Sequence, residues 1–239
     1  MDPRYKSPTA AVVDDGASAD FRDLSTFTTA LTWMLRAGAA LAVVGLWSSA
    51  SQLEMLSRDF AQSEAAENAQ RVVAVAGGTV ILRVITFFVF GRWIVLAHRN
   101  LDALGAHYLD FRPGWAVGWF FIPIANLWKP FQAMRSLWRH SHSVHHAEIQ
   151  NDTWVLPTWW ALWLIFLFMG NVSQTVSRNA NGLDDYRAIT EAALAGGIVD
   201  VLLCIVASIL VSRTWRAQEA QRENPERYEP AKGFADTAA

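Results

Sequence analysis

The chain has 239 residues, of which 52% are hydrophobic and 18% are charged, a composition too apolar and too poor in charge for an ordinary soluble domain. Its net charge of −2 provides no basic field that would favour a nucleic-acid partner. A single cysteine, Cys204, excludes an internal disulfide and a thiolate metal cluster. Twelve tryptophans, a residue type that favours bilayer interfaces, indicate a membrane protein.

The N-terminal residues 1–25 are polar and lack the apolar segment of a secretory signal peptide, so we predict a disordered tail. A membrane domain is expected over residues 26–212, followed by a polar C-terminal tail over residues 213–239. Four segments of this domain reach the length of about 20 apolar residues that a bilayer core requires. The predicted spans are residues 31–53, 72–96, 154–177 and 188–211.

The distribution of lysine and arginine orients these spans. With the N-terminus inside, most basic residues fall in cytoplasmic segments, and the outer loops hold only Arg58, Arg71, Arg178 and Arg187. Cytoplasmic loops of membrane proteins carry an excess of lysine and arginine. We therefore expect a multi-pass protein of the cell membrane with both termini in the cytoplasm.

Residues 114–128, which contain GWFFIPIANLW, are apolar but short. As a helix they would extend about 22 Å, and Pro123 would interrupt the hydrogen-bond ladder. A fifth span would also place the basic C-terminus outside. A re-entrant or interfacial segment packed among the spans is therefore favoured, with a full span as the open alternative.

Residues 130–146 follow with the pattern of an amphipathic helix. Phe131, Met134, Leu137 and Trp138 fall on one side, and arginine and histidine recur on another. Such a helix is typical of one lying in the lipid headgroup plane. The alternative is a helix whose apolar side packs on a neighbouring part of the protein.

Three runs, FGRWIVLAHRNLDALGA, PGWAVGWFFIPIANLWKPFQAMRSLWRHS and LPTWWALWLIF, resemble the bacterial membrane-protein family catalogued as domain of unknown function 4328. The resemblance covers roughly residues 70–212 and, more weakly, the first span. It implies a multi-span integral membrane protein. Its hallmark is the second of these runs, here called the tryptophan–proline block. The resemblance implies no activity. The histidine-rich run HSHSVHH does not follow the family pattern.

Arg83 and Asp200 are charged residues inside predicted spans. Each lies about 17–18 Å below the outer end of its span by helix rise. An isolated charge at a helix centre costs roughly 2.5–3.5 kcal/mol, so an ion pair at matched depth is the expected resolution. The alternative is a structural role for Arg83 with other backbone partners.

Two further clusters are candidate sites. A polar and basic group around Pro123 and Pro130 could bind lipid phosphate or a small anion. Its members are Asn126, Lys129, Gln132, Arg135 and, after the second span, Arg99. His142 and His146 share a helix face and are weak candidates for a metal site. No metal and no cofactor is expected, because no other motif supports one.

The sequence thus predicts an all-α polytopic membrane protein: a four-span helical bundle with a proline-broken re-entrant or interfacial segment and an amphipathic helix. The favoured function is a non-enzymatic scaffold, sensor or partner-binding component with a cytoplasmic-side lipid or anion contact surface. The alternative is a small oligomeric transporter or channel-like protein that uses Arg83 and Asp200. Expected partners are the bilayer, anionic lipid, and a second copy or another protein.

Overall fold

The computed structural model describes residues 20–104, 112–142, 154–180 and 182–223. In these residues every regular element is helical, which confirms the predicted all-α class. The elements are α1 (Ser25–Leu56), α2 (Gln62–Ala103), α3 (Pro113–Gly118), the 3-10 turns η1 (Trp119–Phe121) and η2 (Ala125–Leu127), α4 (Lys129–Ser141), α6 (Val155–Asn179) and α7 (Leu183–Glu223).

Within the described ranges, four helices are long and apolar enough to cross a membrane: α1, α2, α6 and α7. The chain is therefore a multi-pass membrane protein. Three of these helices are much longer than the predicted spans; the 42 residues of α2 rise about 63 Å, roughly twice the hydrocarbon thickness of a bilayer. The extra turns are polar and continue the helices beyond the apolar segments.

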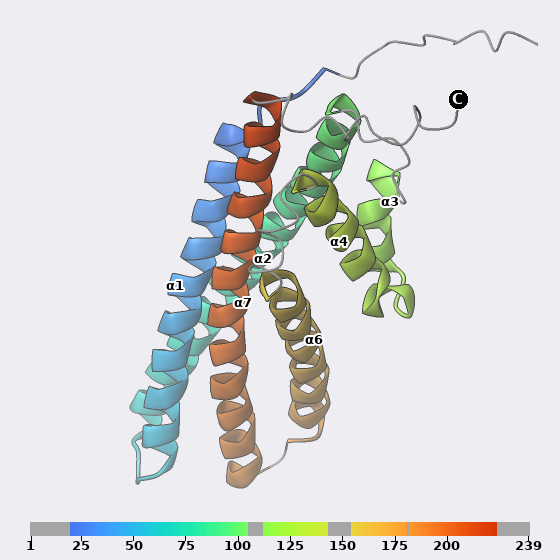
Figure 1. The fold of residues 1–239 in the computed structure, drawn as a ribbon. Coiled ribbons are helices and arrows are strands. Elements are labelled where there is room, and N and C mark those ends of the chain that lie inside the picture. The colour runs from blue at the N-terminus through green and yellow to red at the C-terminus, as the bar shows by residue number, and fades with distance from the viewer. Residues whose placement is uncertain (1–19, 105–111, 143–153, 181, 224–239) are drawn as a thin grey trace, which may run out of the picture.

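The long helices form an antiparallel arrangement in which α7 lies alongside α1, α6 packs on α7, and α2 packs on α1 (Figure 1). The start of α1 and the end of α7 lie at one end of the bundle, here called the termini end (Figure 1). The connections from α1 to α2 and from α6 to α7 lie at the other end (Figure 1). There Arg187 donates a hydrogen bond of 2.6 Å to the carbonyl oxygen of Leu56.

Close approach of α1 and α7 depends on small residues at their contact. A Cβ added at Gly197 would lie 2.6 Å from Cδ2 of Leu46, closer than real side-chain carbons approach. A Cβ at Gly38 would lie 3.3 Å from Sγ of Cys204. Small residues at membrane helix interfaces permit such backbone proximity, where dispersion packing drives association.

The tryptophan–proline block forms a hairpin, here called the α3–α4 hairpin, which comprises α3, η1, η2 and α4. It lies toward the termini end, where α3 packs on α2 and α4 contacts α2, α6 and α7 (Figure 1). Its tip bonds its own backbone: the N–H of Asn126 donates to the oxygen of Ile122 at 2.7 Å, and that of Trp128 to Ala125 at 3.2 Å. Short local turns thus supply hydrogen bonds where Pro123 interrupts the helix.

Helix α4 is amphipathic, but its apolar side faces protein. Ala133, Met134, Leu137 and Trp138 are buried in the core that α4 shares with α2, α6 and α7. The interpretation of a helix with its apolar side in the headgroup plane is therefore wrong, because neighbouring helices already cover that side. The exposed side of α4 carries Gln132 and two arginines.

The described residues of the predicted N-terminal tail pack on the bundle. The ring of Phe21 stacks on Trp215 with centroids 6.0 Å apart, and Leu24 is buried. Asn100 holds the backbone of Arg22 through both ends of its amide, at 3.0 and 2.8 Å. The docked structure begins before residue 25, and the predicted tail over residues 1–19 lies outside the described residues. At the other terminus α7 continues to Glu223, past the predicted boundary at residue 213.

Candidate functional site

The structure brings Arg83 of α2 and Asp200 of α7 together inside the bundle. Nη2 of Arg83 lies 2.5 Å from Oδ2 of Asp200. The Asp200 side chain is 9% exposed and that of Arg83 is 42% exposed. The guanidinium carbon of Arg83 also lies 4.4 Å from the ring centroid of Phe166 on α6, a cation–π geometry. The ion pair therefore links three of the long helices.

A partly open cavity of about 580 Å³ lies beside this ion pair. Its walls come from α1, α2, α6, α7 and the tip of the α3–α4 hairpin. Helices α2 and α6 both line it and do not pack on each other along their length, although Arg83 meets Phe166 and Phe90 meets Trp159 across them; each packs on its other neighbour. Because backbone packing does not close the bundle between α2 and α6, we infer that the cavity opens there, toward the bilayer.

Aromatic and aliphatic side chains make up most of the lining of this cavity. Phe87 and Phe120 make an edge contact with centroids 6.2 Å apart, and Phe120 makes a second with Trp163 at 6.0 Å. Phe90 of α2 and Trp159 of α6 also belong to the lining, with centroids 6.1 Å apart. Besides the ion pair, the polar residues of the lining are Thr79, Thr86 and Cys204. Of the polar groups, the indole Nε1 of Trp163 is buried without a hydrogen-bond partner in the described part of the chain.

The second group of predicted site residues lies on and around the α3–α4 hairpin. Gln132 and Arg135 are exposed on α4, and Arg99 is exposed near the end of α2. Nζ of Lys129 lies 5.7 Å from the ring centroid of Trp119. Oδ1 of Asn126 is buried and, within the described residues, has no partner, so it does not accept a bond from the backbone near Pro123.

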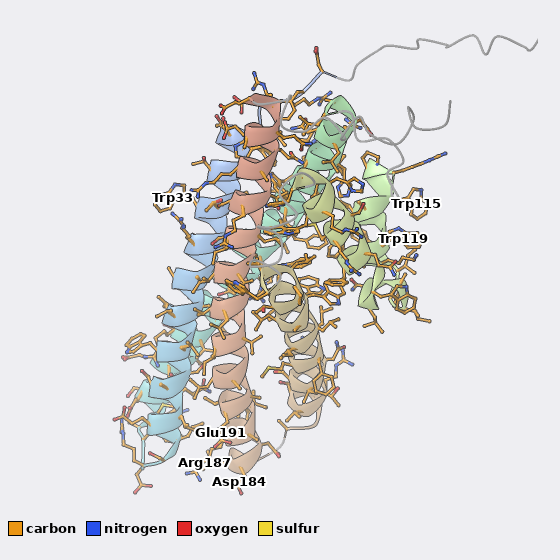
Figure 2. All side chains as sticks on the ribbon, in the orientation of Figure 1. Trp33, Trp115, Trp119, Asp184, Arg187 and Glu191 are labelled. Carbon is orange, nitrogen blue, oxygen red and sulfur yellow. The ribbon has the colours of Figure 1, made fainter. Side chains whose placement is uncertain are left out.

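Tryptophans mark the outer surface of the bundle toward the termini end. Figure 2 shows Trp33 pointing outward from α1 and Trp115 and Trp119 on the outer side of the hairpin. Asp184 and Arg187 lie at the opposite end (Figure 2). Trp33 and Trp115 are 62% and 52% exposed, as expected of residues that anchor a protein at a membrane interface.

The histidines are engaged in local contacts where they are described. The ring of His142 stacks on Trp138 with centroids 4.2 Å apart, and its Nδ1 lies 2.8 Å from the oxygen of Trp138. His146 lies outside the described residues, so the predicted pairing with His142 is not observed. In residues 20–142, 154–180 and 182–223, apart from the gap at 105–111, no group of three or more His, Cys, Asp or Glu side chains could hold a metal ion.

Sequence reasoning missed a set of buried polar residues at the termini end. Gln218 is fully buried and donates from Nε2 to the oxygen of Ala97 at 2.9 Å and to Oγ of Ser141 at 3.1 Å. It joins α7 to α2 and α4. A second buried bond, 3.0 Å from Nε1 of Trp93 to Oγ1 of Thr28, joins α2 to α1. The signal available in the sequence was a polar residue, Gln218, at a position of α7 that falls on the buried side of the helix.

Residues 57–216 match the family described as "Domain of unknown function (DUF4328)", which is more than half of the chain. The chain belongs to this family. The DUF4328 match begins directly after α1, so the first span, where the resemblance is weaker, lies outside it. Helix α2, the α3–α4 hairpin, α6 and most of α7 lie within the match. No curated protein and no solved structure matches the chain.

Proposed function

We propose that this DUF4328 protein is a non-enzymatic membrane component that inserts its α3–α4 hairpin into the cytoplasmic leaflet and presents the basic side of α4 to anionic lipid headgroups. Both termini then lie in the cytoplasm of the cell. The observation that carries the proposal is the division of exposed residues: the hairpin tip exposes apolar side chains, and α4 exposes charged and polar ones.

The hairpin tip reaches partway along the apolar helices. Phe121 contacts Phe87 of α2 with centroids 5.8 Å apart. Phe87 lies nine residues before Leu96, where the apolar segment ends, which is about 13 Å of helix rise. The contact of Phe120 with Trp163, nine residues after Trp154, supports the same depth on α6. This is less than half of a hydrocarbon core of about 30 Å, which supports a re-entrant segment.

The surface of the tip suits lipid contact. Phe121, Ile122, Ile124, Leu127 and Trp128 are 40–71% exposed, which water would disfavour and acyl chains would accept. The local 3-10 hydrogen bonds are what make this depth tolerable, because unsatisfied backbone groups cost several kcal/mol in lipid. Residues 114–128 were expected to pack among the spans. In the structure one side of this segment packs on α2 and α6, and the other side is exposed.

Helix α4 would contact lipid through charge alone. Its apolar side is covered by protein, whereas Arg135 and Arg139 are exposed one helical turn apart. A basic residue near an anionic leaflet contributes about 1 kcal/mol of attraction. The excess of basic residues at the termini end supports the cytoplasmic placement of this surface.

The test uses the full chain in nanodiscs that contain phosphatidylcholine and phosphatidylglycerol. Native mass spectrometry measures the ratio of the two lipids retained by the protein. Replacing Arg135 and Arg139 by Gln should lower the enrichment of phosphatidylglycerol by roughly fivefold for each residue. Gln174→Ala, an uncharged substitution at an exposed position of α6, is the control and should leave it unchanged. Equal enrichment in the wild type and the double variant contradicts the proposal.

The orientation has its own test. Arg139→Cys, in a chain with Cys204 replaced by Ala, should react with a membrane-impermeant maleimide in inverted vesicles and remain unlabelled in intact cells. Labelling in intact cells would place α4 outside and refute the topology.

The alternative of a transporter or channel receives less support. A conduit needs polar groups along a water-filled path from Arg83 toward Asn126. The cavity that contains Arg83 is lined mainly by apolar and aromatic residues, and Asn126 is not part of its lining. The arrangement favours binding of an apolar molecule over passage of a hydrated one.

A further inference from the structure

The cavity beside the ion pair has the properties of a binding site rather than of loose packing. Its volume of about 580 Å³ falls within the range of roughly 300–1,000 Å³ that is usual for small-molecule sites. It combines apolar walls with one polar corner, which is the usual composition of such sites. With the opening inferred between α2 and α6, a guest would enter from the bilayer.

The polar corner offers hydrogen-bond donors. A guanidinium carries five N–H donors in a planar fork. The bond from Nη2 of Arg83 to Asp200 uses one of them, and Arg83 itself lines the cavity. Trp163 also lines the cavity, and its buried indole N–H lacks a partner within the described residues. That N–H has no accessible surface and so does not face the cavity; the donors open to a guest with acceptor oxygens are those of Arg83.

The charge of this corner selects against an anionic guest. Arg83 and Asp200 together are neutral, so a carboxylate or phosphate would leave one uncompensated negative charge in a low-dielectric site. Such a charge is costly unless it is paired. A carbonyl oxygen accepts the same hydrogen bonds without adding charge. The site therefore favours a neutral acceptor.

The shape of the walls selects a flat guest. Phe87, Phe90, Phe120, Trp159 and Phe166 contribute aromatic rings to the lining. Aromatic side chains pack favourably against another planar ring in offset or edge geometry. Ester carbonyls of glycerolipids lie at the membrane surface, whereas Arg83 lies about 17 Å of helix rise from the outer end of its span. A ring carbonyl on an apolar molecule reaches this depth without carrying a headgroup.

We propose that this cavity binds a neutral, bilayer-soluble molecule with a planar carbonyl-bearing ring and an apolar tail, the chemistry of a membrane quinone. The carbonyl accepts hydrogen bonds from Arg83, the ring packs among the phenylalanine and tryptophan side chains, and the tail leaves between α2 and α6. This binding is independent of the headgroup contact proposed for α4.

The test measures thermal unfolding of the full chain in nanodiscs, followed by circular dichroism, as decylubiquinone is added. The wild type should show a saturable rise in melting temperature, because a ligand that binds the folded state stabilises it. Leu82→Trp places a large side chain in the cavity lining and should weaken binding at least tenfold. Ile81→Trp, at the neighbouring and 64% exposed position outside the lining, should bind as the wild type does.

Two further variants test the polar corner. Arg83→Met combined with Asp200→Leu removes both charges and should weaken binding tenfold or more while preserving the fold. Trp163→Phe keeps the ring and removes an N–H that is closed off from the cavity, so it is the control and should bind as the wild type does.

Competing probes decide the chemistry. Dodecylbenzene, which has a ring and tail without a carbonyl, should bind at least tenfold more weakly than decylubiquinone, and oleate should also bind more weakly. The proposal is overturned if the wild type shows no saturable stabilisation, or if Ile81→Trp loses as much as Leu82→Trp. Equal binding of dodecylbenzene, tighter binding of oleate, or occupation by phosphatidylcholine alone would overturn it equally.

Discussion

Breaking the Arg83–Asp200 pair one partner at a time should cost far more than removing both partners together. Arg83→Met leaves the Asp200 side chain, which is 9% exposed, among apolar helices without its cation. A single charge at a helix centre costs roughly 2.5–3.5 kcal/mol, so a loss of about 3 kcal/mol is expected.

Asp200→Leu should cost less, because Arg83 keeps part of its stabilisation. The guanidinium carbon still lies 4.4 Å from the ring centroid of Phe166, and a cation–π contact contributes about 0.5–2 kcal/mol. The side chain is also 42% exposed and long enough to reorient. A loss of about 2 kcal/mol is therefore expected.

The double variant should lose only about 1 kcal/mol or less, because replacing both charges by apolar residues of similar volume is often close to neutral. The coupling energy between the two positions is then about 4 kcal/mol by difference. Unfolding in mixed detergent micelles with increasing SDS, followed by circular dichroism, gives all four free energies. Losses that add within about 0.5 kcal/mol would show that the pair is not coupled and would refute the reasoning.

Three other substitutions test the packing. Gly197→Ala should lower stability by about 1 kcal/mol or more because its Cβ would lie 2.6 Å from a Leu46 methyl carbon, whereas Gly77→Ala, with nothing within 4 Å, should be neutral or stabilising; melting temperatures compare the two. Asn100→Ala removes both amide bonds to the Arg22 backbone, so limited proteolysis should cut the N-terminal segment faster; an unchanged rate would mean that this clamp does not hold it. Gln218→Ala should destabilise the protein by about 1–3 kcal/mol and speed hydrogen exchange in residues 129–141, and exchange that rises equally across all helices would contradict a local role.

The number of spans could be predicted because a bilayer imposes a simple condition on sequence. An apolar run of about 20 residues has few other uses, and its backbone must be helical. The same regularity places Arg83 and Asp200 at one depth, since each residue advances a helix by about 1.5 Å. Depth alone does not select a partner, however; the contact also requires α2 and α7 to be close, which no sequence pattern specified.

The ends of the helices could not be predicted in the same way. Hydropathy reports where lipid begins, and a helix can continue in water as a polar extension. The run TWRAQEAQRE therefore looked like a tail, although it completes α7 and contains Gln218, which is buried against α2 and α4. Phe21 and Leu24 were likewise assigned to a tail because tertiary contacts of isolated apolar residues leave no periodic signal.

The position of α4 shows the limit of amphipathic patterns. The pattern identifies which side of a helix avoids water, and it cannot tell whether lipid or protein covers that side. In this fold the apolar side of α4 is needed to complete the core at the termini end, around Met134 and Leu137. Only the basic side remains for the membrane surface, which changes the expected lipid contact from insertion to charge.

Phe120 connects the hairpin to the cavity. It belongs to the hairpin tip, and it also lines the cavity and contacts both Phe87 and Trp163. The tip therefore contributes an apolar wall to the cavity on the side of the termini end. The backbone N–H groups of Asn126 and Trp128 already donate hydrogen bonds within the tip, so they are not available to a guest. An apolar wall closes that direction, and the inferred opening lies between α2 and α6. The ion pair is therefore more accessible to a molecule dissolved in the bilayer than to a hydrated solute. For this reason the fold favours binding of a guest from the lipid phase.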